Sequence, residues 1–458
     1  MSEAGLLAAQ DKMREGGVAQ AAIDVFTHYY KAVETGATGL IPEETIEPLT
    51  EIDSLETVEI TDDEAREALS KTVLIKLNGG LGTSMGMDKA KSLLPVRDGK
   101  SFLDLIVNQV QKAREHYGVT LPLIFMDSFR TREDTLEALS KHPGIEVDGL
   151  PLDFLQNREP KLRADDLTPV EWEADPELEW CPPGHGDIYT ALVASGVLDA
   201  LIDKGYRYAM TSNSDNLGAT PSAQIAGWFA QSGAPYAPEM CRRTPADVKG
   251  GHLAIRKSDG RVILRDTAQT PKDQMHYFTD QFRHPFFHTN NLWFDLIVLR
   301  DTLKERNGIL GLPLIKNAKT VDPADSSSTP VIQMETAMGA AVEAFEGATA
   351  IEVPRSRFLP VKTTNDLLLV RSDVYELDDM GALVQRGDQA CVISLDSRYY
   401  KTIHEFEKRF PYGPPSLRRA TKLTVDGDWT FGKGVKIVGS VRLEDPGYST
   451  DVSDGALL

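Results

Sequence analysis

The chain has 458 residues, a length that indicates two or three folded units. Hydrophobic residues make up 41% and charged residues 26%, which is ordinary for a soluble globular protein. Its 49 Lys and Arg and 69 Asp and Glu give a formal net charge of −20 at pH 7, which disfavours a nucleic acid partner because such partners need a basic face. The three cysteines (Cys181, Cys241 and Cys391) are far apart and form no C-x-x-C pair, so the sequence predicts neither a disulfide framework nor a zinc site.

The sequence also carries no sign of secretion or membrane insertion. The N-terminal stretch MSEAGLLAAQDKMREGG has acidic residues early and no apolar block long enough for a signal peptide. No run of about eighteen apolar residues is present, so no membrane span is predicted. We therefore expect a cytoplasmic protein.

The first 70 residues are expected to be mainly helical. One helix is predicted in residues 19–36, where helical spacing separates the apolar side chains Ala22, Val25, Phe26, Tyr29, Tyr30 and Val33. A second helix is predicted in residues 61–72, with Thr61 as its N-cap. We expect residues 1–70 to form a helical segment attached to a larger core.

From Thr72 onward, apolar strands alternate with amphipathic helices. We expect strands at residues 72–77, 121–128 and 206–215, and helices at residues 101–118 (capped by Ser101), 131–142 and 187–205. This alternation predicts an α/β fold with βαβ units and a mostly parallel sheet covered on both faces. Ligands of such sheets bind outside the carboxyl ends of the strands, so the residues that follow each strand are the first candidates for a site.

Residues 418–445 have a different pattern, in which short β-branched runs are separated by glycine turns. Two interpretations stay open: a few coils of a β-solenoid, or a strand hairpin packed on the main domain. A short solenoid has exposed ends, which predict a homo-oligomer formed through this unit. We accordingly divide the chain into a helical segment at residues 1–70, a main domain at residues 71–400, and a connecting helix with a β-rich domain at residues 401–458.

A glycine-rich loop, NGGLGTSMG, follows the first predicted strand of the sheet. Glycines let backbone N–H groups approach an anion without interference from a Cβ atom. The spacing fits neither the P-loop nor the dinucleotide fingerprint, because no G-x-x-x-x-G-K-[ST] is present and Met85 stands where a third glycine is needed. A plain tight turn needs only one or two glycines, so we expect a phosphate-binding loop with Lys91 as the cation beside it.

Two further motifs place polar groups where they can meet a charged ligand. In CPPGHGDIY, His185 lies between two glycines at the start of a predicted helix, and we expect it to donate a hydrogen bond to a phosphate. In TSNSDNLG, Asn213 and Asp215 follow a strand and point the same way on an extended backbone. A carboxylate at this position suits Mg²⁺, although the motif is also compatible with an Asx-rich turn.

One possible metal motif is discounted. His284 and His288 in HPFFH have the spacing of two ligands on one face of a helix, but Pro285 between them argues against a helix there.

In this order along the chain, the motifs resemble the UTP–glucose-1-phosphate uridylyltransferases of the eukaryotic type, also called UDP-glucose pyrophosphorylases. The glycine loop is followed by FLQNREPKL, WCPPGHGDIY, SNSDNLGA, DVKGGHLA, HTNNLWFDL, QMETAMGAA and PRSRFLPVKTTNDLLLVRSD, so the resemblance spans residues 74 to about 373. It implies a Rossmann-like nucleotidyltransferase of the glycosyltransferase-A-like type, with a mixed, mostly parallel sheet. It also implies that the C-terminal unit is a small left-handed β-helix.

The resemblance implies a nucleotide site built largely from backbone groups. Gln156 would pair its side-chain amide with the uracil edge, since an amide offers both a donor and an acceptor. Gly184 would lie against the uracil, and Lys91 would hold the phosphates of UTP. The backbone groups would come from Leu77, Asn78, Gly79 and Gly80.

The resemblance also implies sugar-phosphate and catalytic residues. Lys362 in FLPVKTTND would reach the reacting phosphate, and Asp215 would hold the metal cofactor, Mg²⁺. Contacts to the sugar phosphate would come from His185, Asn213, Ser214 and Asn290. His288 stands where the family commonly has Asn, which is a departure on the sugar side of the site. For Arg355 and Arg357 we expect ion pairs that support the scaffold.

The reaction implied by the resemblance joins UTP and glucose 1-phosphate to give UDP-glucose and pyrophosphate. A UDP-N-acetylhexosamine pyrophosphorylase is the nearest alternative, but that family has Arg shortly after the Gly-Thr of its loop, whereas Ser84 follows Thr83 here. The same difference disfavours the bacterial type of sugar nucleotidyltransferase. A non-catalytic nucleotide-binding protein on the same fold would have lost the carboxylate or the lysines, and Asp215, Lys91 and Lys362 are all present.

Overall fold

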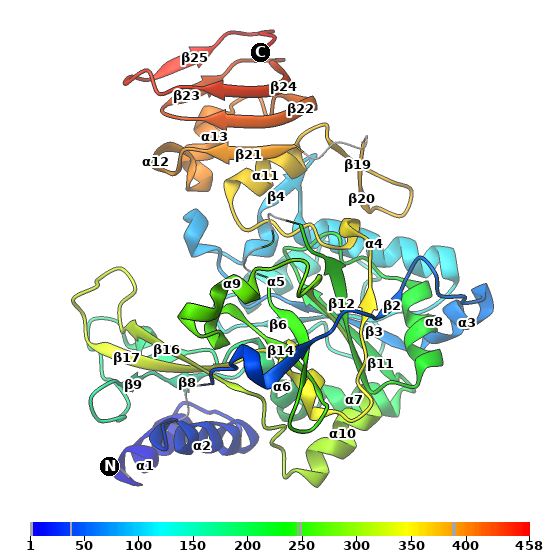
Figure 1. Ribbon diagram of the computed structural model, residues 1–458, viewed down its shortest axis with the longest axis vertical. Helices are drawn as coiled ribbons and strands as arrows, with labels where there is room; N and C mark the ends of the chain where they lie inside the picture. Colours follow the sequence, from blue (N-terminus) through cyan, green and yellow to red (C-terminus); the bar gives the residue numbers. More distant parts are fainter. Residues whose placement is uncertain (1–2, 37–38, 245–246, 248–249, 387–390) are drawn as a thin grey trace.

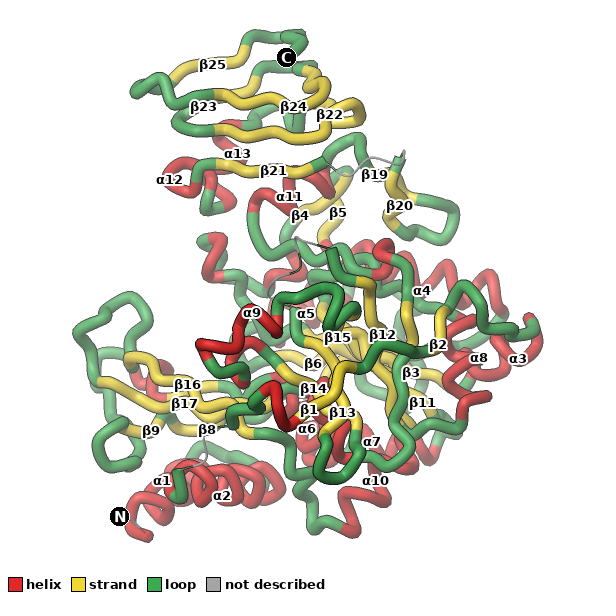
Figure 2. Tube along the Cα trace, viewed as in Figure 1, coloured by secondary structure: helices red, strands yellow, loops and turns green. Residues whose placement is uncertain are grey.

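The computed structural model describes residues 3–36, 39–244, 247, 250–386 and 391–458, and its centre is one eight-stranded sheet. Figure 2 shows these strands in yellow with helices around them. The strands, in their order across the sheet, are β2 (Asp53–Ser54), β18 (Ile351–Glu352), β12 (Tyr236–Arg242), β15 (Phe286–Asp295), β11 (Tyr208–Asn213), β3 (Thr72–Leu77), β6 (Leu123–Asp127) and β7 (Asp153–Leu155). Every pairing in the sheet is parallel except the two made by β15. The predicted mixed α/β fold with a mostly parallel sheet is confirmed.

Both faces of the sheet are buried, because alternate side chains of each strand enter opposite cores. Leu74 of β3 belongs to the core formed with α3 (Asp62–Ser70), α4 (Phe102–Tyr117) and α8 (Ala223–Ser232). Val73 and Ile75 belong to the core on the other face, with α6 (Ile188–Ala194), α7 (Val197–Asp203) and α10 (Leu296–Glu305).

The order of the strands changes direction beside β3. From β3 the chain passes through α4 to β6 and through α5 (Arg132–Leu139) to β7, and it then returns through α6 and α7 to reach β11 on the other side of β3. The parallel neighbours β3 and β11 therefore have connections that leave their carboxyl ends in opposite directions. Open α/β sheets form a ligand-binding crevice at such a point.

The predicted helices are present, with one difference. Thr61 and Ser101 cap α3 and α4, each in a capping box with the acidic residue three positions later. The single helix predicted in residues 187–205 was wrong, because the chain breaks into α6 and α7 at Gly196, whose φ of +75° no continuous right-handed helix accepts. Within the described residues, no helix is both long and apolar enough to cross a membrane.

The N-terminal helices lie at one end of the molecule, far from the C-terminus (Figure 1). Helices α1 (Glu3–Glu15) and α2 (Gln20–Glu34) pack against an antiparallel arm made of β9 (Leu162–Arg163), β17 (Pro330–Thr336) and β16 (Leu314–Thr320). A second small antiparallel sheet consists of β1 (Ile46–Pro48), β13 (His252–Arg256) and β14 (Val262–Arg265).

The C-terminal unit stacks its strands in parallel at the opposite end of the molecule (Figure 1). Strand β22 (Ser416–Val425) pairs in parallel with β21 (Val392–Leu395) and β24 (Lys436–Leu443), and β23 (Trp429–Phe431) pairs in parallel with β25 (Thr450–Val452). A hairpin would pair its strands antiparallel, so the hairpin interpretation is excluded. Leu423 and Phe431 of this unit share one apolar core with α4 and α11 (Thr364–Arg371).

The cap of α4 allows a simple test of the fold. We expect Ser101→Ala to lower the free energy of unfolding by about 1 kcal/mol, because the Asp104 N–H loses the Ser101 Oγ acceptor at 3.1 Å. Ser140→Ala, at an exposed helix end where the hydroxyl donates only to the Glu137 carbonyl, should leave stability nearly unchanged. Urea unfolding followed by circular dichroism measures both, and equal midpoints for the two variants would contradict the assigned cap.

Candidate active site

Two adjoining hollows lie at the carboxyl ends of β3 and β11. The first has a volume of about 320 Å³ and the second about 470 Å³, and His185 and Asn213 line both, so the two form one continuous cleft. Of the residues predicted from the sequence, the first hollow is lined by Leu77, Gly79, Gly80, Lys91, Gln156, Gly184, Ser214 and Asp215. The second is lined by Asn290 and Lys362. The structure thus brings every predicted site residue except Asn78 to the wall of this cleft.

The glycine loop presents bare backbone to the first hollow. The N–H groups of Gly79 and Gly80 have no hydrogen-bond partner within the described part of the chain, whereas the carbonyl oxygen of Gly80 accepts from the Lys91 N–H at 3.0 Å. A Cβ atom on Gly79 would lie 2.8 Å from Oε1 of Gln156, and the space above Gly80 is open. Glycine at these two positions therefore keeps donors accessible and leaves room for the Gln156 amide.

Asn78 lies beneath the cleft and supports it. Its side chain is 2% exposed and donates to Asp127 at 2.7 Å and to Thr135 at 2.9 Å, and its N–H donates to the Met126 carbonyl. Burial raises the pKa of Asp127 to about 7. Only the carbonyl oxygen of Asn78 is left without a described partner, so any contact from this residue to a ligand would be limited to that atom.

Ser214 ties the ends of the two strands together. Its hydroxyl donates to the Leu77 carbonyl at 2.7 Å and lies 3.1 Å from Oδ1 of Asn78, and its N–H also donates to the Leu77 carbonyl. These bonds join the end of β11 to the end of β3 and fix the backbone on which Asp215 sits.

Asp215 and Lys91 form an ion pair in the first hollow. The Lys91 Nζ lies 2.6 Å from Oδ2 of Asp215, and both side chains are about one-fifth exposed, at 18% and 19%. Oδ1 of Asp215 is buried and has no hydrogen-bond partner. A buried carboxylate oxygen without a partner is costly unless a donor or a cation meets it when the site is filled.

This oxygen makes Asp215 the best candidate for a divalent cation. Among the described residues, no group of three or more His, Cys, Asp and Glu side chains could hold a metal by themselves. Mg²⁺ does not need such a group, because it is commonly bound by one or two carboxylates together with water and substrate phosphates. The donor set therefore fits an ion that enters with a phosphate ligand.

His185 is a neutral hydrogen-bond donor. The Met338 N–H donates to its Nδ1 at 2.9 Å, which is possible only when Nδ1 carries no proton. The surrounding protein lowers the pKa of His185 to about 4, although the residue stays open to the cleft. Its Nε2–H can then donate to an anionic ligand without bringing positive charge.

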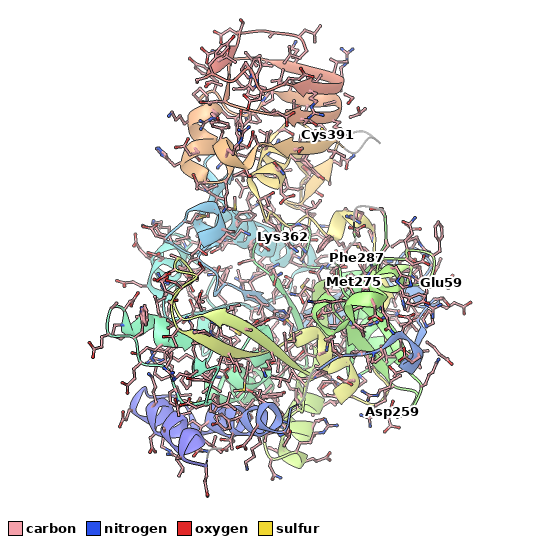
Figure 3. All side chains as sticks on the ribbon, turned by 60° about the vertical axis from the view of Figure 1, so that its left-hand side comes forward. Glu59, Asp259, Met275, Phe287, Lys362 and Cys391 are labelled. Carbon is pink, nitrogen blue, oxygen red and sulfur yellow. The ribbon has the colours of Figure 1, made fainter. Side chains whose placement is uncertain are left out.

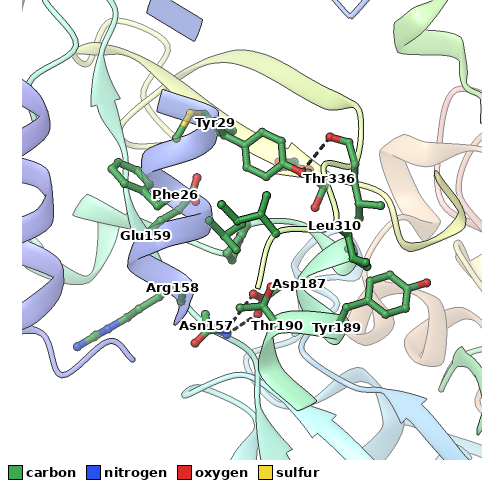
Figure 4. A pocket seen from close by; sticks show the side chains of 18 of the residues that line it. Phe26, Tyr29, Asn157, Arg158, Glu159, Asp187, Tyr189, Thr190, Leu310 and Thr336 are labelled. Carbon is green, nitrogen blue, oxygen red and sulfur yellow. Dashed lines mark hydrogen bonds between the residues drawn. The ribbon is translucent and has the colours of Figure 1, made fainter. Parts of the chain in front are cut away.

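The segment that carries Gly184 and His185 is braced from behind. Asp187 accepts hydrogen bonds from the N–H and Nδ2 of Asn157 at 2.6 Å and 2.9 Å, which connects this segment to the neighbour of Gln156 (Figure 4). The cavity drawn in Figure 4 has a volume of only about 30 Å³ and lies between α2 and this segment. It has room for about one water molecule, so it is part of the support and not a substrate site.

The second hollow is lined by more polar side chains than the sequence analysis had named. Asn290 has a φ of +66° and donates from Nδ2 to Oδ1 of Asn213 at 3.2 Å. His288 accepts at Nδ1 from the Asn290 N–H at 3.0 Å, and burial lowers the pKa of His288 to about 3. Asp247 and Asp266 also line this hollow. Sequence analysis missed both, because Asp247 follows β12 and Asp266 follows β14, and neither strand was predicted from the sequence.

Lys362 is an unpaired cation beside the second hollow. Its ammonium makes no hydrogen bond or ion pair within the described residues, and only its N–H is used, donating to Asp366 at 2.9 Å. Figure 3 shows Lys362 at the boundary between the C-terminal unit and the body that holds the sheet. Lys249, in the motif DVKGGHLA, lies outside the described residues.

The arrangement suits a ligand with a flat polar ring, a chain of phosphates and a sugar. Gln156 and Gly184 offer an amide and bare backbone at one end, and two lysines, three carboxylates and neutral donors follow along the cleft. Free backbone N–H groups and cations that are fixed before the ligand arrives stabilise phosphate charge well.

Comparisons with known proteins agree with this geometry. The family model for UTP–glucose-1-phosphate uridylyltransferase matches residues 23–438. The UTP–glucose-1-phosphate uridylyltransferase of Saccharomyces cerevisiae is 40% identical over 395 residues, which are 85% of this chain and 77% of the yeast protein. The enzyme of that name from Solanum tuberosum is 38% identical over 86% of this chain and 81% of its own length.

Solved structures are similar over the whole chain. A mutant UDP-glucose pyrophosphorylase from Leishmania major in complex with UDP-glucose is 43% identical, has a TM-score of 0.93, and is matched over 100% of this chain and 98% of its own. A structure from Trypanosoma brucei described as a UDP-glucose phosphorylase is 42% identical with a TM-score of 0.90, over 99% of this chain and 98% of its own.

The environment of His185 can be tested through Gly184, which has a φ of +79° and whose added Cβ would lie 2.5 Å from the Thr336 carbonyl oxygen. Gly184→Ala must therefore shift the loop that carries His185 and loosen the packing that buries its ring. Because burial lowers the pKa of His185 to about 4, we expect this pKa to rise toward its ordinary value of 6.5, measured by NMR titration of the ring.

Gly196→Ala is the matched control for this experiment. Gly196 has a similar φ of +75° but no atom within 4 Å of an added Cβ. It should cost only the backbone strain, about 1 to 2 kcal/mol, and leave the His185 titration unchanged. An unshifted His185 pKa in Gly184→Ala would mean that the packing of this loop does not set the protonation of His185.

Proposed function

Because this chain belongs to the UTP–glucose-1-phosphate uridylyltransferase family, we propose that it joins UTP and glucose 1-phosphate to give UDP-glucose and pyrophosphate. The observation that carries the proposal is the convergence of Lys91, Asp215 and Lys362 on one cleft with the free N–H groups of the glycine loop. These are the groups that a reaction between two polyanions requires.

In this proposal UTP occupies the first hollow. The uracil lies between Gln156 and Gly184, where the amide offers the donor and the acceptor that a uracil edge needs. The phosphates lie over Gly79 and Gly80. The ammonium of Lys91, which lies 2.6 Å from Oδ2 of Asp215 in the same hollow, moves from the carboxylate onto the phosphates. Backbone and cation together replace the water that the phosphates lose.

Glucose 1-phosphate occupies the second hollow, and its phosphate oxygen attacks the α-phosphorus of UTP in line while pyrophosphate leaves on the opposite side. The attacking oxygen is already an anion, so no strong general base is needed. His185 holds the sugar phosphate with its Nε2–H, and Asn213 and Asn290 meet the sugar hydroxyls. Lys362 stabilises the negative charge that develops at the α-phosphorus, so catalysis depends on position and charge.

A divalent cation held by Asp215, which we propose to be Mg²⁺, would neutralise oxygens of the α-phosphate and of pyrophosphate. The free Oδ1 of Asp215 supports this role for its carboxylate. The residues of the chain bind, orient and screen the two substrates around that position.

Several finer features belong to the same proposal. We assign the nucleotidyltransferase core to residues 71–400, the helical segment to residues 1–70, and the connecting helix and β-rich unit to residues 401–458. The parallel coils of the last unit support a left-handed β-helix, and its exposed end supports a homo-oligomer built through it. A glycosyltransferase-A-like core and a cytoplasmic location are further expectations of the proposal.

The activity is tested by a coupled assay for pyrophosphate release. The assay combines UTP, CTP, ATP and GTP in turn with glucose 1-phosphate, galactose 1-phosphate and N-acetylglucosamine 1-phosphate, with and without Mg²⁺. We expect release with UTP and glucose 1-phosphate in the presence of Mg²⁺. A preference for N-acetylglucosamine 1-phosphate would point to the hexosamine enzyme, and UTP binding without release would point to a non-catalytic protein.

The role of Lys362 gives a second prediction. Lys362→Ala should lower kcat by about 100-fold or more and leave the KM for UTP nearly unchanged, since the ammonium acts on charge that develops in the transition state. Lys433→Ala removes an exposed lysine from the C-terminal unit and should leave both constants unchanged. Turnover of Lys362→Ala close to that of the unmodified protein would rule out this assignment.

A further inference from the structure

We propose that the buried ion pair of Glu239 and Arg357 is the positioning centre of the active site, which holds Lys362, Asp215 and Asn290 at fixed distances from one another. Neither residue lines the cleft, so both act through the groups bonded to them. The proposal rests on the proposed function, because it concerns the step in which those three groups meet the substrates.

The pair is fully enclosed and fully bonded. Glu239 lies in β12 and is 0% exposed, and Arg357 lies in the 3₁₀ turn Arg355–Arg357 and is 7% exposed. Nε and one terminal nitrogen of Arg357 donate to the two oxygens of Glu239 at 2.6 Å and 2.8 Å. Such a two-point contact fixes the orientation of the guanidinium as well as its distance.

Two further donors complete the hydrogen bonding of the Glu239 carboxylate. Trp293 Nε1 donates to Oε1 of Glu239 at 2.9 Å, and Asn291 Nδ2 lies 3.1 Å from Oε2. Burial alone would raise the pKa of Glu239, but Arg357 and these donors hold it below its ordinary value, so the carboxylate stays charged. The pair has no net charge and neither partner lines the cleft, so we expect its main effect on the reaction to come from position.

The pair connects the turn after β11, which carries Asp215, with the segment that carries Lys362. The backbone carbonyl of Arg357 accepts from Nδ2 of Asn216 at 3.1 Å, and Oδ1 of Asn216 accepts from the Leu359 N–H at 2.8 Å. The Val361 N–H then donates to the Asp215 carbonyl at 3.1 Å. Lys362 is the next residue, so its backbone is tied to that of Asp215 through this set of bonds.

The same pair holds a bulge in β15 that carries Asn290. The pairing of β12 with β15 shifts register between Pro238 and Met240, opposite residues 289–291. Thr289 donates from its hydroxyl to the Glu239 carbonyl at 2.7 Å, and Asn291 contacts both the Glu239 carboxylate and the Arg357 carbonyl. Asn290, between them, is held at φ +66°, and its side chain reaches Asn213.

Bulges and strained residues next to an active site are ways to aim a side chain, and they persist only where the surroundings hold them. Here the surroundings are Glu239 and Arg357. A buried ion pair adds little stability compared with apolar residues of the same size. The pair has a clear use, however, if Lys362, Asp215 and Asn290, which lie on three separate segments, must keep fixed positions relative to one another.

The test is the variant Arg357→Lys, which keeps the positive charge and loses the two-point contact. We expect kcat to fall about 10- to 100-fold, while the KM values for both substrates change less than about threefold. A crystal structure of the variant should show residues 358–362 displaced and the Val361-to-Asp215 hydrogen bond broken.

Arg409→Lys is the matched control, because Arg409 is also a buried arginine, 5% exposed, that bonds two carboxylates, Asp428 and Glu405, in the C-terminal unit. It should lose stability as Arg357→Lys does but keep its kcat within about twofold. Equal kcat values in the two variants would mean that the Glu239–Arg357 pair is structural support only.

A second variant tests the same proposal if Arg357→Lys does not fold. Asn216→Ala leaves the ion pair intact and removes its link to Leu359, and it should also lower kcat with little change in KM. Normal kcat in either folded variant, together with undisplaced residues 358–362, would overturn the proposal. If the unmodified protein released no pyrophosphate, the proposed function would fail, whereas the crystal structures would still decide whether the pair positions this segment.

Discussion

The active site depends on one feature of the sheet, namely that β3 and β11 are parallel neighbours whose connections leave in opposite directions. At the point between them, the backbone N–H groups of Gly79 and Gly80 have no partner within the described part of the chain and stay free to meet a ligand. Ser214 bonds the two strand ends to each other and so fixes the distance between the glycine loop and Asp215. The rest of the cleft is arranged around this opening.

The chain binds anions although its net charge is −20. It does so with few cations in defined positions and not with a broad basic surface. Lys91 is already paired with Asp215, and the ammonium of Lys362 has no partner among the described residues. Burial lowers the pKa of both histidines of the cleft, His185 and His288, and each accepts a backbone N–H at Nδ1, so both are neutral. The charge on Lys91 is held by Asp215, whereas the charge on Lys362 is positioned only through its backbone, which explains why a buried ion pair that fixes that backbone would matter to turnover.

The strand-end rule predicted the glycine loop and Asp215, because both follow apolar strands and parallel sheets bring such ends together. The roles of Gln156, Gly184, Asn290 and Lys362 were predicted from the family resemblance. The sequence could not predict that the Asn78 side chain points away from the cleft and bonds Asp127, since a residue in a loop can point either into the cleft or into the protein interior. Gly196 could end a helix or sit within one, and only the observed φ decided between them. Lys76 and Glu239 interrupt otherwise apolar strands, but their partners Ser212 and Arg357 are 118 or more residues away, beyond the reach of local pattern analysis.

The central claim is that the nucleotide binds at the opening between β3 and β11. A crystal structure of the protein with UTP and Mg²⁺ tests this most directly. The account predicts electron density for uracil between Gln156 and Gly184, with the phosphates over Gly80 and within reach of Lys91 and Asp215. Density for the phosphates elsewhere, with these residues unchanged from their ligand-free contacts, would contradict it.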